Sequence, residues 1–507
     1  MSESTKPRAG AAEWAGLTLL ALPTVLLGLD VTVLYLVLPS MSADLNPSPT
    51  QELWIMDVYG FLIAGLLITM GTLGDRIGRR RLLVIGVVAF AGASVFAAVA
   101  PTAGLLILAR ALLGVAGATL MPSTLSLISN MFHQPQQRAV AIGIWATMFA
   151  LGMVAGPVVG GALVDAFWWG AAFLVAVPIA VIVVAGAKAL LPEHSDPEPG
   201  RLDLVSVALS LATILPIVYA IKHVAADGID PVSAVLAVVG VVAGVVFTRR
   251  QRRLPAPLLD VTLFGDRAFS AALAVLLIGL VGVGGTMYLV TQYLQLVEGM
   301  TPFTAGLWMG PPALAMFVAA VGAPLIARRV PPGLVMAATL TLSIGGYALL
   351  AVAGVGDTTA VVFGFALVYL GLGAIAALGT DMVVGAAPAT KSGSAAAMSE
   401  AVQELGVAVG VAVLGSLTSV VYAAHMGTSD GLSAVVAADE VPGRVVEAAR
   451  GAFTTGVNVA ATVAGIAILA AVVLCLTVLT RVRPLGESEQ AAQNCEVRLP
   501  WWRRRSG

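Results

Sequence analysis

Residues 71–82 read Gly-Thr-Leu-Gly-Asp-Arg-Ile-Gly-Arg-Arg-Arg-Leu and separate two apolar runs. Each run is long enough to cross a bilayer, which predicts a tight loop between two membrane helices. The four arginines place this loop in the cytoplasm, because clustered cationic residues beside spans stay inside. A plain cytoplasmic anchor would explain the arginines but not the spaced glycines or the single aspartate. We therefore predict that the loop does more than anchor the chain, and that its key residues are Gly71, Asp75, Arg76, Gly78 and Arg79.

Asp75 is the residue of this loop with two predicted contacts. It stands four residues before Arg79, so the two side chains can pair if the helix continues. Asp75 can also be attracted to the positive end of the span predicted at 394–422, if that end lies close to the loop. Asp75 is thus predicted to act as a conformational latch.

The composition identifies a polytopic membrane protein. Of 507 residues, 59% are hydrophobic and 11% are charged, whereas soluble proteins carry about 25% charged residues. With roughly 20 residues for each span, the apolar segments predict an all-α fold of about fourteen transmembrane helices. The net charge of −1 gives no reason to expect a nucleic-acid partner.

Several function classes lack their motifs in this sequence. No Gly-Lys-Ser/Thr phosphate loop occurs, so an ATP-driven pump is not expected. An enzyme would need a nucleophile–base pair or a cluster of metal ligands, whereas the four histidines fall in loops or at span ends far apart. Cys475 falls in the last span and Cys495 in the tail, so neither a disulfide nor a metal site is indicated.

The cationic residues and a weak repeat predict the organisation. Most Lys and Arg fall in cytoplasmic loops when both termini are placed inside the cell, and Lys222 is one of the few that fall outside. Gly322–Arg329 closes one span much as Gly71–Arg79 closes another, which suggests parallel repeats. We predict a six-helix bundle at 1–200, two inserted spans at 201–255, a second six-helix bundle at 256–482 and a cytoplasmic tail at 483–507. The inserted pair carries charges only near its ends and is interpreted as a structural spacer.

Charged side chains inside the predicted spans are the candidates for function, because each is costly in a bilayer. Asp30 lies roughly 13 Å from the outer end of its span, near the midplane. Asp57 and Arg110 lie at similar depth in two spans that both begin outside, roughly 8–9 Å inward, so they can pair. A structural ion pair that only holds helices together is the alternative. Asp57 is then expected to stay charged, while Asp30, without a basic neighbour in its own span, exchanges protons.

Glu400 and Glu404 lie one turn apart on one face of the span predicted at 394–422. Both are desolvated on an apolar helix and repel each other when charged. No basic residue lies in the spans of the second half to neutralise them, so they are available to a cation or a proton. The alternative is a structural pair facing water.

The span predicted at 139–163 carries a glycine motif, Gly152, Gly156, Pro157 and Gly160. Glycines at four-residue spacing form a flat stripe that allows close helix contact, and the proline removes one backbone donor. We expect this stripe to matter for the contact across which the halves move rather than for the cargo.

Taken together, these motifs resemble the fourteen-span drug:proton antiporters of the major facilitator superfamily. The loop matches the superfamily pattern G-x-L-x-D-R-x-G-R-R, and the glycine motif is similar to the one that marks its antiport exporters. Residues 29–39 resemble the family signature L-D-x-T-x-V-N-V-A-L-P, but Tyr35 replaces Asn and Val37 replaces Ala. The resemblance covers nearly the whole chain.

The resemblance implies a multidrug exporter in the bacterial plasma membrane, driven by the proton gradient without a cofactor. Its cargo would be small amphipathic cations such as quaternary ammonium compounds, dyes and fluoroquinolones, and it would act as a monomer. No acid occurs between Pro311 and Ala327, where relatives that export divalent cations carry one, which argues against that cargo. The alternatives are an exporter of an endogenous metabolite, lipid or self-made antibiotic, and a membrane sensor that transports nothing. The residues implied in proton and substrate handling are Asp30, Asp57, Arg110, Glu400 and Glu404, with Tyr35, Trp54 and Tyr59 lining the substrate path.

Overall fold

The computed structural model describes residues 9–193, 203–228, 230–254, 257, 259, 261–387, 392–427, 431–437 and 441–482. All regular structure in these ranges is helical. The helices are α1 (Ala11–Leu45), α2 (Pro49–Ile77), α3 (Arg79–Ala98), α4 (Ala103–Met131), α5 (Pro135–Ala166), α6 (Ala171–Leu174), α7 (Ala176–Leu190), α8 (Leu204–Asp227), α9 (Pro231–Gln251), η1 (Val261–Gly265), α10 (Arg267–Gln292), η2 (Tyr293–Val297), α11 (Pro302–Trp308), α12 (Gly310–Ala327), α13 (Pro332–Val352), α14 (Thr358–Ala386), α15 (Ser392–Met426), α16 (Leu432–Ala437), α17 (Gly443–Thr477) and η4 (Leu479–Arg481).

The number of spans agrees with the sequence. Thirteen helical segments of the described chain are long and apolar enough to cross a membrane. A fourteenth is added when the two parts of α2, Pro49–Leu67 and Thr69–Ile77, which meet at 57°, are taken as one span. The prediction of an all-α polytopic membrane protein is therefore confirmed. The predicted tail at 483–507 lies outside the described residues.

Short polar residues define where the helices begin. Ser48 caps α2 by accepting a hydrogen bond from the Gln51 amide at 3.2 Å, and Pro49 occupies the first helical position. Asp230 caps α9 in the same way, at 2.8 Å from the Ser233 amide. These caps satisfy backbone donors that the first turn of a helix leaves unpaired.

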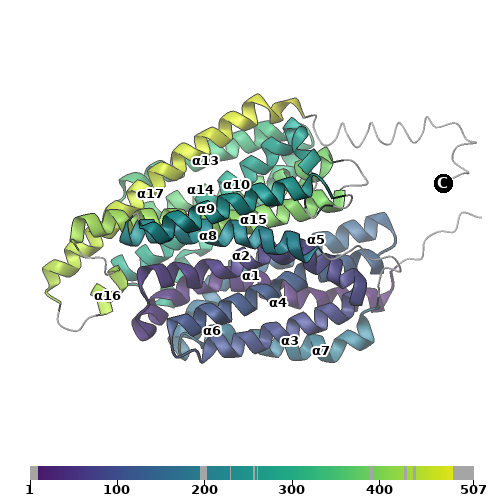
Figure 1. Ribbon diagram of the computed structural model, residues 1–507, viewed down its shortest axis with the longest axis horizontal. Coiled ribbons are helices and arrows are strands. Elements are labelled where there is room, and N and C mark those ends of the chain that lie inside the picture. The colour runs from purple at the N-terminus through teal and green to yellow at the C-terminus, as the bar shows by residue number, and fades with distance from the viewer. Residues whose placement is uncertain are drawn as a thin grey trace, which may run out of the picture.

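The helices form two groups with a pair between them (Figure 1). Helices α1–α7, purple to blue, pack against one another, and α10 and α12–α17, green to yellow, form the second group. The teal helices α8 and α9 pack against each other, and α8 contacts both α2 of the first group and α15 of the second. The inserted pair thus lies against the boundary between the two groups.

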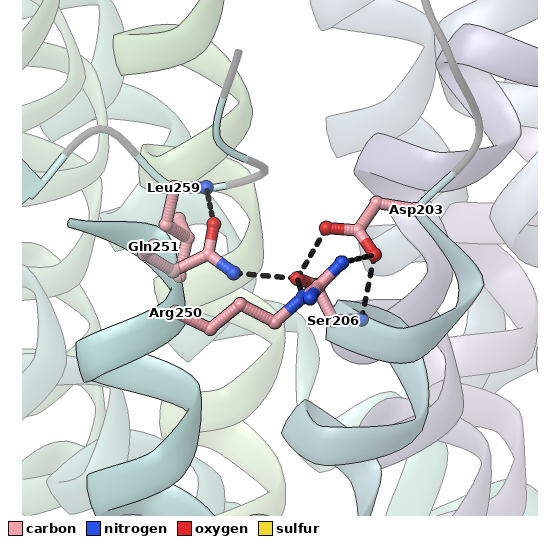
Figure 2. A network of polar contacts seen from close by, with 5 residues as sticks. All are labelled: Asp203, Ser206, Arg250, Gln251 and Leu259. Atoms are coloured by element: carbon pink, nitrogen blue, oxygen red, sulfur yellow. Dashed lines mark hydrogen bonds and ion pairs between the residues drawn. The ribbon is translucent and has the colours of Figure 1, made fainter. Parts of the chain in front are cut away.

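A polar network fixes the ends of α8 and α9 that the sequence places at the cytoplasm (Figure 2). Asp203 accepts hydrogen bonds from Arg250 at 2.9 Å and from the Ser206 hydroxyl at 2.5 Å. The Gln251 amide donates to Ser206 at 2.7 Å, and its oxygen accepts from the Leu259 backbone at 3.1 Å. Although partial burial raises the pKa of Asp203, hydrogen bonds from Ser206 and Arg250 bring that pKa below its ordinary value. The network ties the hairpin to the chain that leads into α10.

The two groups also touch at the ends that the sequence predicts to lie outside the cell. Helix α11 packs against α5, where Gly306 lies against the Pro157 backbone and Gly161 against the Pro302 backbone. The Tyr288 hydroxyl of α10 donates a hydrogen bond to Glu52 of α2 at 3.1 Å. Side chains larger than hydrogen would not fit at these glycines, so the two groups close against each other on the side that the sequence predicts to face outward.

Candidate transport site

A central cavity of about 370 Å³ lies between the two groups of helices. Its wall is mainly apolar and aromatic, with Tyr35 of α1, Phe149 of α5, Phe317 of α12 and Tyr369 of α14. Pockets that take drug-sized ligands combine such walls with a few polar groups. Here those groups include Thr32, Gln403 and two carboxylates, Glu400 and Glu404.

Glu400 and Glu404 both reach this cavity from α15, as their one-turn spacing predicts. Both side chains are half-buried, and within the described residues neither has an ion-pair partner. Beside them, Ser399 and Gln403 donate hydrogen bonds to the hydroxyl of Thr380, at 3.1 and 3.4 Å. The cavity therefore contains two acids and no fixed cation among the residues that line it.

A second, smaller cavity of about 30 Å³ lies against the first. Asp57, Arg110 and Glu404 line it, with the rings of Tyr35 and Tyr59. Tyr35 and Glu404 line both cavities, so they form the boundary between them. The structure thus brings three of the five predicted charged residues around one small space.

Arg110 pairs with Asp30, not with Asp57 as the sequence analysis expected. Its guanidinium donates a hydrogen bond to Asp30 at 2.9 Å and another to the Ile55 carbonyl at 3.2 Å. Tyr59 lies under the guanidinium, 4.4 Å from ring centre to cation. Gly114, one turn along α4, lies against the Tyr59 backbone, so α4 packs closely on α2. Asp30 therefore has a basic partner from another helix, although its own span contains none.

Asp57 pairs instead with Lys222 of α8, at 2.7 Å between Nζ and Oδ2. Both side chains are 0% exposed. The prediction that Lys222 lies in the outer loops is wrong, because its side chain is buried among helices. The interpretation of the inserted pair as a structural spacer stays a prediction, since a buried ion pair can also serve structure. Lys222 lies little more than one turn before the end of α8. Such a position in the sequence does not indicate that neighbouring helices bury the side chain.

The three aromatic residues expected along the substrate path have different surroundings. Tyr35 lines the central cavity, and Tyr59 lines only the small one. Trp54 lines neither, and its ring lies 4.4 Å from the Lys222 ammonium. Its cation contact is therefore with the protein's own lysine in this structure.

Comparison with known families decides the identity of the fold. Residues 20–411 match the family model described as Major Facilitator Superfamily.

The chain belongs to the major facilitator superfamily.

Individual relatives agree with this membership. The chain is 42% identical over 476 residues to the multidrug efflux pump LfrA of Mycolicibacterium smegmatis, covering 90% of this chain and 94% of that protein. It is 32% identical to the methyl viologen resistance protein SmvA of Salmonella typhimurium, covering 83% and 86%. A solved bacterial homologue of the lysosomal transporter Spinster, inward-facing and unoccupied, superposes with a TM-score of 0.63 at 17% identity, covering 92% of this chain and 98% of that one. The predicted superfamily and its fold are confirmed, and this is a superfamily of transporters, not of enzymes.

The predicted gating loop of this superfamily member is almost entirely helical. Helix α2 continues to Ile77 and α3 begins at Arg79, so Gly78 alone makes the turn, with φ of 104°. That left-handed region favours glycine. The predicted pair is confirmed, because the Arg79 guanidinium lies 2.5 Å from Asp75. The same guanidinium donates to the Pro122 carbonyl of α4 at 3.4 Å, which joins the turn to the bundle.

Since Asp75 pairs with Arg79 in this outer-closed structure, the latch to α15 remains a prediction for the inner-closed state. We expect Asp75→Asn to slow dye export several-fold, because the inner-closed state loses its attraction to the start of α15. Expression and dye binding should stay close to those of the wild type. The matched control is Arg81→Gln in the same loop, where the side chain is 74% exposed. Dye export by Asp75→Asn at the rate of the control would remove the latch.

The glycines of the α5 motif pack against α1 of the same group of helices. Gly152 lies against the Val25 backbone, Gly156 against Thr32, and Gly160 against Val33. The Thr32 hydroxyl also donates to the Met153 carbonyl at 3.0 Å. The adjoining face of α5, with Pro157 and Gly161, meets α11 of the other bundle. The glycine stripe therefore positions the α1 segment that holds Asp30.

We expect Gly156→Ala to impair transport of every substrate alike, because the added methyl would overlap the Thr32 side chain and push α1 away. Overpacking of this kind costs about 1–3 kcal/mol of stability. The control is Gly143→Ala on the same helix, where a methyl would meet nothing within 4 Å. Thermal unfolding and transport of two unlike dyes would be measured for both. A change in substrate preference without a general loss would contradict a positioning role.

Proposed function

We propose that this transporter is a proton-coupled exporter of amphipathic cations that works by alternating access of its two bundles. The observation that carries the proposal is the central cavity, in which an apolar and aromatic wall surrounds two carboxylates without cation partners among the described residues. A lipophilic cation can satisfy both parts of such a site. Its apolar surface meets the wall, and its charge meets the acids.

Competition for one charge would supply the coupling. A protonated glutamate is neutral and attracts no cation, whereas an ionised glutamate in a cavity of low dielectric constant attracts one strongly. Binding of cargo and binding of a proton then exclude each other, and their alternation on the two sides of the membrane is antiport. Glu404 is the best-placed residue for this role, because it lines the central cavity and also the small cavity with Asp57 and Arg110.

We assign different roles to the other acids. Asp30 is paired with Arg110 and Asp57 with Lys222, so neither is proposed to bind cargo directly. Each is proposed instead to respond to the movement of the bundles. Glu400, nearer the start of α15, is proposed to guide cargo into the cavity. The residues proposed for proton and substrate handling are the five expected from the sequence, Asp30, Asp57, Arg110, Glu400 and Glu404. Only the role of Asp30 differs from the one expected.

The relatives favour export over the other transporter functions. LfrA is named a multidrug efflux pump and SmvA a methyl viologen resistance protein. By that similarity we propose cationic drugs and biocides as cargo, in the plasma membrane of a bacterium, with a monomer as the transporting unit. No cofactor is proposed, since the proton gradient supplies the driving force.

One alternative has a specific observation in its favour. The chain is also 34% identical to a probable actinorhodin transporter of Streptomyces coelicolor, covering 80% of this chain and 72% of that protein. A polycyclic metabolite made by the host would fit an aromatic cavity as well as a dye does. Competition by neutral and by cationic aromatics for dye export would separate the two classes of cargo.

Ethidium efflux from energised cells tests the proposed function. Cells that express the protein are expected to lose preloaded ethidium faster than cells with an empty vector. A protonophore should remove that difference, because it collapses the gradient that drives antiport. Efflux at the empty-vector rate, or efflux that a protonophore leaves unchanged, would contradict the proposal.

A further inference from the structure

The ion pair between Asp57 and Lys222 joins the inserted hairpin to the first bundle. Its charged atoms are 2.7 Å apart, and both side chains are 0% exposed. Trp54, one turn before Asp57 on α2, places its ring 4.4 Å from the same ammonium. A buried cation between a carboxylate and an indole face is well stabilised only while the carboxylate keeps its charge.

This pair is bare. Within the described residues, and apart from the contact between them, neither the Asp57 carboxylate nor the Lys222 ammonium has a hydrogen-bond partner. Buried ion pairs that serve stability normally have their remaining lone pairs and protons satisfied, because desolvation otherwise exceeds the Coulombic gain. The Arg110–Asp30 pair shows the contrast, since Arg110 also donates to the Ile55 carbonyl. A buried ion pair that lacks supporting hydrogen bonds inside a membrane span points to a role in function.

Helix α8 contacts both groups of helices. A small apolar cluster joins Phe61 of α2, Val218 of α8 and Ala408 of α15. At its other end, α8 is fixed to α9 and to the chain before α10 by the network around Ser206 (Figure 2). The hairpin is thus anchored to the second half of the chain, while Lys222 reaches the first half.

The ionisable groups around Asp57 come from several helices. Arg110 of α4, Glu404 of α15, Tyr35 of α1 and Tyr59 of α2 line the small cavity with it. Tyr288 of α10 also interacts electrostatically with Asp57. Arg110 is held by Asp30, so Lys222 is the cation in direct contact with Asp57. His223, which follows Lys222 in the chain, places its imidazole 3.5 Å from the Asp230 carboxylate at the start of α9.

We propose that Lys222 is a tethered counter-ion of the transport cycle, which holds Asp57 ionised in the outer-closed state and must separate from it when the bundles move. Protonation of Asp57 would free Lys222, and separation of α8 from α2 would favour protonation of Asp57. The inserted hairpin would then link proton uptake to the movement of the bundles. Lys222 is a positioning residue in this scheme, since it acts through Asp57 and touches no cargo. The proposal rests on the proposed proton-coupled export.

The first test needs no substrate. Carbodiimides label protonated carboxyl groups in apolar surroundings, and the labelled peptide can be measured by mass spectrometry. A buried carboxylate that loses its cation neutralises by taking up a proton, so Lys222→Gln should raise labelling of Asp57 by about tenfold. Lys222→Arg should keep labelling low, because it keeps the cation. The matched control is Lys188→Gln at the exposed end of α7, which should leave Asp57 labelling unchanged.

The second test separates coupling from structure. Purified variants in liposomes would be compared for unfolding temperature and for dye transport driven by a pH gradient. We expect Lys222→Gln and the double variant Asp57→Asn with Lys222→Gln to fold and to lose transport by about tenfold or more, while Lys222→Arg keeps much of it. A purely structural pair would behave otherwise, since neutralising both partners would restore transport.

Two results would overturn the proposal. One is unchanged carbodiimide labelling of Asp57 in Lys222→Gln, and the other is recovered transport in the double variant. If the wild type itself shows no transport driven by the pH gradient, the proposed function fails, and the labelling experiment still decides whether Lys222 keeps Asp57 ionised.

Discussion

Replacing Glu404 by glutamine is expected to abolish dye export driven by a proton gradient, with a loss of about tenfold or more and little change in the unfolding temperature. Glutamine keeps the size of the side chain and removes the only charge that cargo and proton would share. The side chain is half-buried and has no ion-pair partner among the described residues, so its neutralisation leaves no cation stranded. Export of every cation should fall together.

Glu400→Gln is the matched control for this substitution. Glu400 lies one turn away on the same helix and lines the central cavity, but not the small cavity that holds Asp57 and Arg110. We expect it to weaken export of some cations and to leave proton coupling in place. Dye transport and proton flux would be measured together for both variants. Equal losses in the two variants, or normal coupling in Glu404→Gln, would remove Glu404 from its assigned role.

Replacing Asp30 by asparagine is expected to impair both transport and stability, because Arg110 would keep its charge in the membrane interior without its carboxylate partner. Breaking a buried ion pair from one side costs about 3–5 kcal/mol. The Arg110 side chain is only 2% exposed, so water cannot replace the lost partner. A lower unfolding temperature and a loss of export of about tenfold or more should appear together.

The double variant Asp30→Asn with Arg110→Gln separates the two effects. Removing both charges should recover much of the unfolding temperature, since no charge is then left unpaired. Transport should stay low if the pair follows the proton cycle as proposed. Full transport by the double variant would show that the pair only holds α1 and α4 together. Undiminished transport by Asp30→Asn alone would contradict the assignment entirely.

Local patterns in the sequence predicted most of the fold. Hydropathy indicated the spans, the i, i+4 spacing predicted the Asp75–Arg79 pair, and the one-turn spacing of Glu400 and Glu404 predicted that both face one cavity. Each of these depends on a single helix or a single turn. A helix fixes which of its own residues share a face, so the sequence contains that information.

Partners on different helices could not be predicted in the same way. Depth in the membrane placed Arg110 level with Asp57, and both do line the small cavity, but depth does not say how each helix is rotated about its axis. Gly114 lies against the Tyr59 backbone of α2, and in this packing the Arg110 guanidinium pairs with Asp30 of α1. The glycine spacing in α5 likewise predicts a tight contact, which is present, without identifying α1 as the partner helix.

Lys222 shows a different limit. Its position near one end of an apolar helix is typical of a cation that reaches the membrane surface. Only the packing of α8 against α2 and α15 buries it, and that packing depends on where an inserted hairpin lies against two bundles. When a lysine lies near the end of an inserted span, the neighbouring helices should therefore be searched for a buried acid that pairs with it.

The central claim is proton-coupled export of cations, and the most direct measurement uses the purified protein in liposomes. Liposomes with an acidic interior would receive a cationic dye outside, and dye uptake and proton release would be recorded at the same time. We expect dye to accumulate against its own gradient while protons leave, and a protonophore to stop both. Dye accumulation without proton release, or accumulation that persists after the pH gradient collapses, would contradict it.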